Sequence, residues 1–317
     1  MNAKKVSVIS GIAAVAIIGL MIKTNLANAR QTQSHKPYEV KEFSIHTPGK
    51  LNVQTSGGYI TVKGSTGNKV RVEMYVTKNG KALMPSDTKL NHFNINIGQD
   101  GNKISAIAKR KAGSGWKFWN RNNISISFVV YTPRKMDADL HTSGGSIEAT
   151  NLSGNQQIAT SGGYLKLDSL KGTVKAETSG GSIHIRKVSG KLNAQTSGGS
   201  ISAQNSKGEL KVHTSGGSIN LKDIAGSVDA STSGGSVIAT LNDIRHATRL
   251  RTSGGNIEVT VPQNAGLKLD LHGNAVHTQL KNFSGTVKRN NVDGTINGGG
   301  PLLSARTSGG SVHISYH

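Results

Sequence analysis

The sequence SIHIRKVSGKLNAQTSGG (residues 182–199) is followed by two related copies, SISAQNSKGELKVHTSGG (200–217) and SINLKDIAGSVDASTSGG (218–235). Each copy is eighteen residues long and ends in Thr-Ser-Gly-Gly, here called the TSGG turn. The tetrapeptide occurs nine times, beginning at Thr55, Thr142, Thr160, Thr178, Thr196, Thr214, Thr232, Thr252 and Thr307. From Thr142 to Thr232 the spacing is constant, which indicates one structural unit stacked on itself.

Within each copy, apolar residues alternate with polar ones in two short segments. In the third copy the segments are 219–221 and 228–232, each of which predicts a strand with one buried face. Gly226 lies between them and Ser233-Gly-Gly follows, so both boundaries have turn residues. We expect the two glycines of the TSGG turn to supply positive φ, and its hydroxyls to satisfy backbone groups.

Stacking such units would bury identical apolar columns against one another, so the sequence predicts an all-β fold. We expect a single-chain, β-helix-like β-solenoid with rungs of about eighteen residues. Eighteen residues also equal three hexapeptides of a left-handed β-helix. The apolar columns recur at offsets of 2, 3, 4 and 2, which favours a two-sheet solenoid and leaves its handedness open.

The chain divides into three predicted regions. Residues 1–29 form a signal peptide, residues 30–140 an N-terminal β capping region continuous with the solenoid, and residues 141–317 the TSGG-repeat solenoid. The capping region contains the separate TSGG copy at Thr55 and longer alternating segments that predict wider rungs or a lead-in sheet. Near the C-terminus, the sequences that begin at Leu271 and Asn297 are interpreted as eroded TSGG turns.

The N-terminus predicts export. Lys4 and Lys5 precede an apolar stretch over residues 6–22, and Ala27-Asn28-Ala29 is a small-x-small cleavage pattern. Cleavage after Ala29 would leave a periplasmic, cell-surface or secreted protein. An uncleaved N-terminal anchor is the alternative.

Charge and composition restrict the function. The chain has 38 Lys and Arg against 17 Asp and Glu, a net charge of +21, which attracts polyanions. We expect an acidic polysaccharide or an anionic envelope lipid as partner, and no sequence-specific nucleic acid, because no recognition motif is present. The sequence leaves the oligomeric state open. Cysteine is absent, so thiol chemistry and disulfides are excluded.

One segment before the repeats combines basic and aromatic residues. Aromatic rings stack on sugars or lie at membrane interfaces, while Lys and Arg bind phosphate or carboxylate. The alternative is that both tryptophans fold back as a lid on the end of the solenoid. The predicted ligand-binding residues are Lys109, Arg110, Lys111, Trp116, Lys117, Trp119 and Arg121.

Catalytic, metal and cofactor sites are not expected. The residue after Gly-Gly is Ser, Tyr or Asn, so the carboxylates of calcium-binding repeats are missing, and the histidines show no ligand spacing. An ice-binding face is disfavoured because the outward strand positions are mixed in character. A carbohydrate-active enzyme of solenoid fold, a polysaccharide lyase or hydrolase, is the alternative function. Its carboxylates would come from Glu148, Asp168, Glu177, Glu209, Asp223 and Asp229.

Four features together resemble the bacterial putative-adhesin family of exported repeat proteins. They are the recurring TSGGSI, the unit TSGGYITVKG at 55–64, the stretch SGWKFWNRNNISISFVVYTP at 114–133, and the export signal. The resemblance implies a β-solenoid of exported bacterial proteins and supplies no catalytic residues. The sequence thus predicts an exported, non-enzymatic repeat scaffold, an adhesin or envelope-associated protein that binds polyanionic glycan or cell-surface material.

Overall fold

The computed structural model describes residues 36–87, 90–111 and 124–317. Within these residues, Pro37–His317 belong to one compact unit that contains twenty-six β-strands. The predicted all-β class is confirmed for this part of the chain. The described residues include no helix long and apolar enough to cross a membrane. The predicted signal peptide lies outside them, and the boundary near residue 140 stays a prediction.

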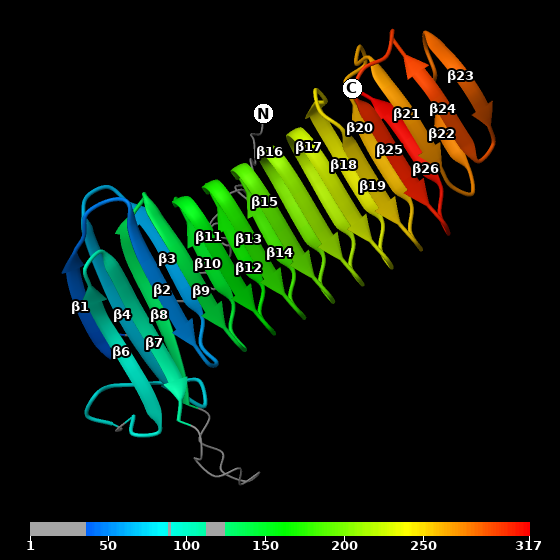
Figure 1. Cartoon of the computed structure of the whole chain (residues 1–317). Helices are drawn as coiled ribbons and strands as arrows, with labels where there is room; N and C mark the ends of the chain where they lie inside the picture. The colour runs from blue at the N-terminus through cyan, green and yellow to red at the C-terminus, as the bar shows by residue number, and fades with distance from the viewer. Residues whose placement is uncertain (1–35, 88–89, 112–123) are drawn as a thin grey trace, which may run out of the picture. The chain divides into compact units, whose positions relative to one another are not determined.

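The repeats build two layers of parallel strands (Figure 1). Layer 1 contains the strands that end at the threonine of a TSGG turn, and layer 2 contains those that follow the turn. Layer 1 includes β9 (Met136–Thr142), β11 (Ser153–Thr160), β13 (Lys171–Thr178), β15 (Ser189–Thr196) and β19 (Thr248–Thr252). Layer 2 includes β10 (Ile147–Thr150), β12 (Leu165–Asp168), β14 (Ile183–Arg186), β18 (Val237–Asp243) and β20 (Ile257–Val261). Two long strands, β16 (Ile201–Thr214) and β17 (Ile219–Thr232), run through both layers and join them into one solenoid-like sheet.

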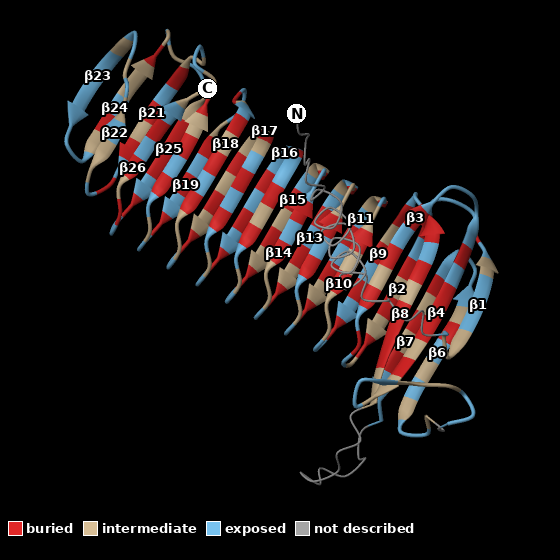
Figure 2. Ribbon diagram, turned by 180° about the vertical axis from the view of Figure 1, so that it is seen from behind, coloured by how far each residue is buried: buried red, intermediate tan, exposed pale blue. Residues whose placement is uncertain are grey.

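The pairing register keeps equivalent residues side by side. Leu165 pairs with Ile183, and Ile183 pairs in turn with Ile201. Along β12 the side chains alternate, so that Leu165 and Leu167 are buried and Lys166 is exposed. Figure 2 shows similar alternating bands of buried and exposed residues across the stacked strands. The predicted period-2 segments therefore form a continuous apolar core between the layers.

The TSGG copies at the two ends of the sequence lie within the same stack. β2 (Gly49–Thr55) and β3 (Ile60–Ser65) pair with β9 and β10, although more than seventy residues separate them along the chain. At the other end, β25 (Leu302–Thr307) and β26 (Val312–Tyr316) pair with β19 and β20. All nine TSGG turns thus follow one another in a single row, which the sequence period alone does not show for Thr55 and Thr307.

Intervening segments form the outer strands at each end. Beyond β2 and β3 lie β7 (Lys103–Arg110) and β8 (Ile124–Pro133), followed by antiparallel β6 (Phe93–Asp100), β4 (Lys69–Lys78), β1 (Glu39–Ser44) and β5 (Lys81–Leu83). Beyond β25 and β26 lie β21 (Leu267–His272) and β22 (Val276–Thr278), followed by antiparallel β24 (Asn291–Ile296) and β23 (Phe283–Lys288). Short antiparallel strands at both ends limit the parallel edge exposed to other chains.

Only one of the two predicted eroded turns is confirmed. The segment that begins at Leu271 does join the row, because Asn274 donates its backbone N–H to the Gly310 carbonyl of the last TSGG turn at 2.8 Å. The segment that begins at Asn297 lies instead at the opposite corner, where Gly300 approaches Gly266. Its glycines resemble a TSGG turn in composition but connect β24 to the start of β25.

The expected reason for the TSGG glycines is wrong. Positive φ occurs at the opposite corner, in Gly172 and Gly190 and their equivalents, and none of the described TSGG glycines has it. The second glycine is needed because the rungs approach closely: a Cβ on Gly181 would lie 1.9 Å from the Gly163 carbonyl oxygen. A side chain at that position would overlap the backbone of the neighbouring turn.

The TSGG threonines point into the molecule and connect consecutive turns. Thr196 is 4% exposed, and its hydroxyl donates to the Gly181 carbonyl of the preceding turn at 2.8 Å. The same hydroxyl accepts a hydrogen bond from the Gly199 N–H of its own turn at 3.3 Å. This arrangement recurs along the row and supports the expectation that the hydroxyls satisfy backbone groups. Threonines buried in this way cannot form an ice-binding face.

Candidate functional site

The predicted ligand-binding segment lies at the end of the row of TSGG turns, beside the Thr55 turn. Ala108 of β7 pairs with Thr55, and Phe128 of β8 pairs with Ile60. Residues 109–127 therefore replace the TSGG turn of this rung. Lys109, Arg110 and Lys111 are described, whereas Trp116, Lys117, Trp119 and Arg121 lie outside the described residues. The combined basic and aromatic site stays a prediction.

The start of this segment lines a groove of about 600 Å³ on the outer face of layer 1. Lys109 and Arg110 come from the end of β7, and His141 comes from β9. The Arg110 guanidinium lies 5.7 Å from the centre of the Phe93 ring, a distance that allows a cation–π contact. Lys111 is placed by its backbone N–H, which donates to the His92 carbonyl at 3.0 Å. The remaining lining residues are Gln54, Thr55, Ser56, Asp139 and Ser143.

The groove is basic in character. Its described lining residues include Lys109, Arg110 and His141, against one carboxylate, Asp139. Sequence reasoning missed Gln54 and His141, although each directly precedes the threonine of a TSGG turn. Their shared position makes them neighbours once the Thr55 turn is known to lie beside the Thr142 turn. An arrangement of this kind favours an anionic ligand.

Exposed tyrosines lie on the outer face of layer 2 near the same end. Tyr59, Tyr131 and Tyr164 are 44%, 37% and 42% exposed. The Lys63 ammonium lies 5.7 Å from the centre of the Tyr131 ring, and the Tyr164 hydroxyl donates to Glu148 at 2.9 Å. Tyr59 and Tyr164 begin layer 2 two rungs apart, a separation of about 10 Å at the usual strand spacing.

The carboxylates considered for catalysis are engaged with neighbouring residues, mostly on adjacent rungs. Glu209 pairs with Lys191 at 3.3 Å, and Asp229 pairs with Arg251 at 3.5 Å. Glu177 pairs with Lys175 of the same strand at 2.9 Å, and Asp223 accepts from the Asn242 amide at 3.4 Å. The other two pairs are Glu148 with Lys166 and Asp168 with Arg186. These six carboxylates are distributed along the repeats, each with its own partner.

Asp168 has the most strongly held carboxylate of this set. Burial alone would raise its pKa, but hydrogen bonds from the Arg186 guanidinium and the Ser169 hydroxyl lower the pKa below its usual value. The Ser169 bond is 2.8 Å long, and the Arg186 Nε bond is 2.9 Å. The pair joins consecutive rungs of layer 2 and thus contributes to the stability of the stack.

Asp168→Asn removes the ion pair with Arg186 and is expected to lower the free energy of unfolding at pH 7 by about 1 kcal/mol. The loss is small because the Arg186 side chain is largely exposed to water. The folded-state pKa lies below the unfolded value, so the stabilisation is present above about pH 4 and is lost as the pH falls through the folded-state pKa. The difference between wild type and variant in urea unfolding should therefore be smaller at pH 2 than at pH 7. An equal difference at both pH values would contradict the assignment. Asp229→Asn, in a half-exposed pair, should have a smaller effect.

Comparison with known proteins supports the family suggested by the sequence. A family model described as Toastrack DUF4097 matches residues 48–315. No curated protein matches the chain at a significant level.

Similar solved structures also span most of the chain. A "putative adhesin" from Bacteroides fragilis is 9% identical with a TM-score of 0.31, and the match covers 88% of this chain and 96% of that one. A "putative lipid binding protein" from Parabacteroides distasonis is 10% identical with a TM-score of 0.30, covering 88% and 97%. A "putative cell adhesion protein" from Clostridium sporogenes is 13% identical with a TM-score of 0.21, covering 89% and 100%. Because the family model covers most of the sequence, the resemblance is confirmed, and the chain belongs to the Toastrack DUF4097 family.

Proposed function

We propose that this protein is an exported, non-enzymatic scaffold of the cell envelope that binds a polyanionic glycan. The observation that carries the proposal is the basic groove at Lys109, Arg110 and His141, from which the basic and aromatic segment begins. The exposed tyrosines lie on the opposite outer face, that of layer 2, and would form a second, separate stacking surface for sugar rings. The predicted signal peptide is the basis for export to the periplasm, the cell surface or the medium.

The proposed scaffold is a β-solenoid with rungs of eighteen residues. Parallel partners such as Leu165 and Ile183, eighteen positions apart, support this rung length. A long polymer would contact several rungs at once, and weak contacts would add along its length. The ion pairs between rungs neutralise many carboxylates locally, while the chain as a whole keeps its net charge of +21.

A second groove is the observation that favours the enzymatic alternative. Asp137 and Asp139 line a space of about 310 Å³ together with Lys50 and Lys103. Asp137 is held by the backbone N–H of Asn155 at 2.7 Å, which favours a structural role. Incubation with polygalacturonate, followed by measurement of reducing ends and unsaturated products, tests this alternative. Cleavage that is lost in Asp139→Asn would replace the scaffold proposal.

The double variant Lys109→Gln with Arg110→Gln is expected to weaken binding to polygalacturonate on the order of tenfold, because two charge-assisted contacts are lost. Affinity should be measured by isothermal titration at 150 mM NaCl, since salt screens surface charges. The matched control is Lys211→Gln with Lys222→Gln, which removes the same charge from exposed positions elsewhere on the repeats. If both double variants weaken binding equally, or if the wild type does not bind, the groove is not the site.

A further inference from the structure

Layer 2 is shortened at its C-terminal end. β22 pairs with β26 through three positions only, Val276 with Val312, His277 with His313 and Thr278 with Ile314. β26 continues for two more residues, Ser315 and Tyr316, beyond the end of this pairing. Layer 1 continues beside it through β21 and β24, the last of which ends at the buried Ile296. The two layers therefore separate, and the end of the core opens to one side.

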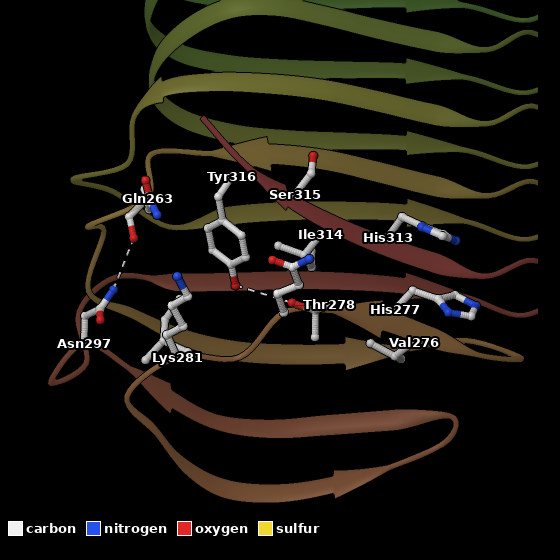
Figure 3. A pocket seen from close by; sticks show the side chains of 12 residues that line it. Gln263, Val276, His277, Thr278, Lys281, Asn297, His313, Ile314, Ser315 and Tyr316 are labelled. Atoms are coloured by element: carbon white, nitrogen blue, oxygen red, sulfur yellow. Dashed lines mark hydrogen bonds between the residues drawn. The ribbon is translucent and has the colours of Figure 1, made fainter.

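This opening is a cavity of about 710 Å³, shown in Figure 3. Its volume lies within the range of small-molecule binding sites. Val276, Ile296, Ile314 and the Tyr316 ring give it an apolar wall. Its polar lining includes Thr278, Lys281 and Asn297.

Several of the polar residues in the cavity are held in place. The Tyr316 and Thr278 hydroxyls lie 3.3 Å apart, within hydrogen-bond distance. The Asn297 amide donates to the Ala265 carbonyl at 3.1 Å, which fixes the loop after β24. The His277 and His313 rings stack with their centroids 4.4 Å apart. Lys281 extends into the same opening from the connection between β22 and β23 (Figure 3).

The charge of the cavity has one sign. None of its described lining residues is Asp or Glu, whereas Lys281 is cationic. His277 and His313 occupy exposed positions of β22 and β26, which alternate with the inward positions of Thr278 and Ile314. Glu258 of β20 lies opposite His313 of β26 in the strand pairing, but it does not line the cavity. The groove at Lys109, in contrast, contains Asp139. An anionic group beside an apolar wall is the ligand chemistry that these residues match.

We propose that this C-terminal cavity binds a small amphipathic organic anion, a carboxylate or phosphate on an apolar body. The anionic head contacts Lys281 at the rim. The apolar body lies against the half-buried Val276 and Tyr316 side chains. This site is separate in sequence and chemistry from the groove proposed for glycan, and its occupancy does not depend on glycan binding.

Titration of the full chain with octanoate, octanol and acetate tests the proposal by isothermal calorimetry. Octanoate should bind about tenfold more tightly than octanol, because only octanoate places a charge beside Lys281. It should bind at least a hundredfold more tightly than acetate, because each buried methylene contributes about 0.8 kcal/mol. Octyl phosphate should behave like octanoate, and inorganic phosphate like acetate. Equal affinity for octanoate and octanol, or no binding of octanoate, overturns the proposal.

Two variants assign binding to this cavity. Lys281→Gln should weaken octanoate binding about tenfold and leave octanol unchanged. Lys268→Gln is the matched control, since this exposed lysine lies on β21 outside the cavity lining. Tyr316→Ala should weaken both ligands through loss of the apolar wall. An equal effect of Lys268→Gln, or unchanged affinities in Tyr316→Ala, would place binding elsewhere and refute the assignment. Circular dichroism of each variant checks that the fold is retained.

Discussion

Gly181→Ala is expected to lower the free energy of unfolding by about 3 kcal/mol, at the upper end of the usual cost of overpacking. A Cβ at this position would lie 1.9 Å from the Gly163 carbonyl oxygen and 2.8 Å from the Tyr164 nitrogen. Both are backbone atoms of the preceding turn, so no side-chain rotation relieves the overlap. The rungs would have to separate at this corner, which would lengthen the Thr196 and Thr178 bonds along the row.

Gly180→Ala, one residue earlier in the same turn, is the matched control. Its Cβ would lie 3.6 Å from the nearest atom, the Ser161 carbonyl oxygen, which is ordinary contact. Neither glycine has positive φ, so the two substitutions differ mainly in available space. Gly180→Ala should change stability by less than about 0.5 kcal/mol. Urea unfolding followed by circular dichroism compares the two, and equal losses would show that turn conformation, not rung contact, requires the glycines.

The close approach at Gly181 shows why the pattern of a single repeat predicts only part of a stacked fold. The repeat period correctly predicts strands, turns and an apolar core, because those depend on residues within one unit. The second glycine is required by an atom eighteen residues earlier in the chain. Only the stack reveals that contact. The sequence therefore identified the right residue but gave the wrong physical reason.

The position of the terminal repeats could not be predicted from spacing. Between Thr55 and Thr142 the chain forms the outer strands β4 to β8 and then returns to pair β9 with β2. The last repeat, at Thr307, likewise lies inside β21 and β22, which precede it in sequence. Parallel pairing between distant segments carries no periodic signal. The neighbours Gln54 and His141 of the candidate groove were missed for the same reason.

The two candidate sites differ in how far they could be predicted from the sequence. Lys109 and Arg110 could be predicted as binding residues because they belong to a basic cluster that precedes the tryptophans. The C-terminal cavity gives no such signal, since it exists because β22 stops at Thr278 while β26 continues to Tyr316. Mismatched strand lengths create the space, and residues from four separate segments line it. Such a site follows from three-dimensional pairing and not from a motif.

Thr196→Val is expected to lower the free energy of unfolding by about 2 kcal/mol, because two backbone groups lose their hydrogen-bond partner. The Thr196 hydroxyl donates to the Gly181 carbonyl and accepts from the Gly199 N–H, at 2.8 and 3.3 Å. Valine has nearly the same shape as threonine, so the apolar contacts of the methyl group are kept. Urea unfolding at pH 7 measures the loss.

Thr196→Ser separates the hydroxyl from the methyl group. Serine keeps both hydrogen bonds and loses one buried methyl, which should cost about 1 kcal/mol. If the threonine row stabilises the stack by bonding consecutive turns, valine must be the more damaging of the two substitutions, although it retains more apolar surface. If packing of the methyl column dominates, the order reverses, because valine would fill the column and serine would leave a space. The ranking of these two variants at one 4% exposed position therefore decides which interaction joins the turns.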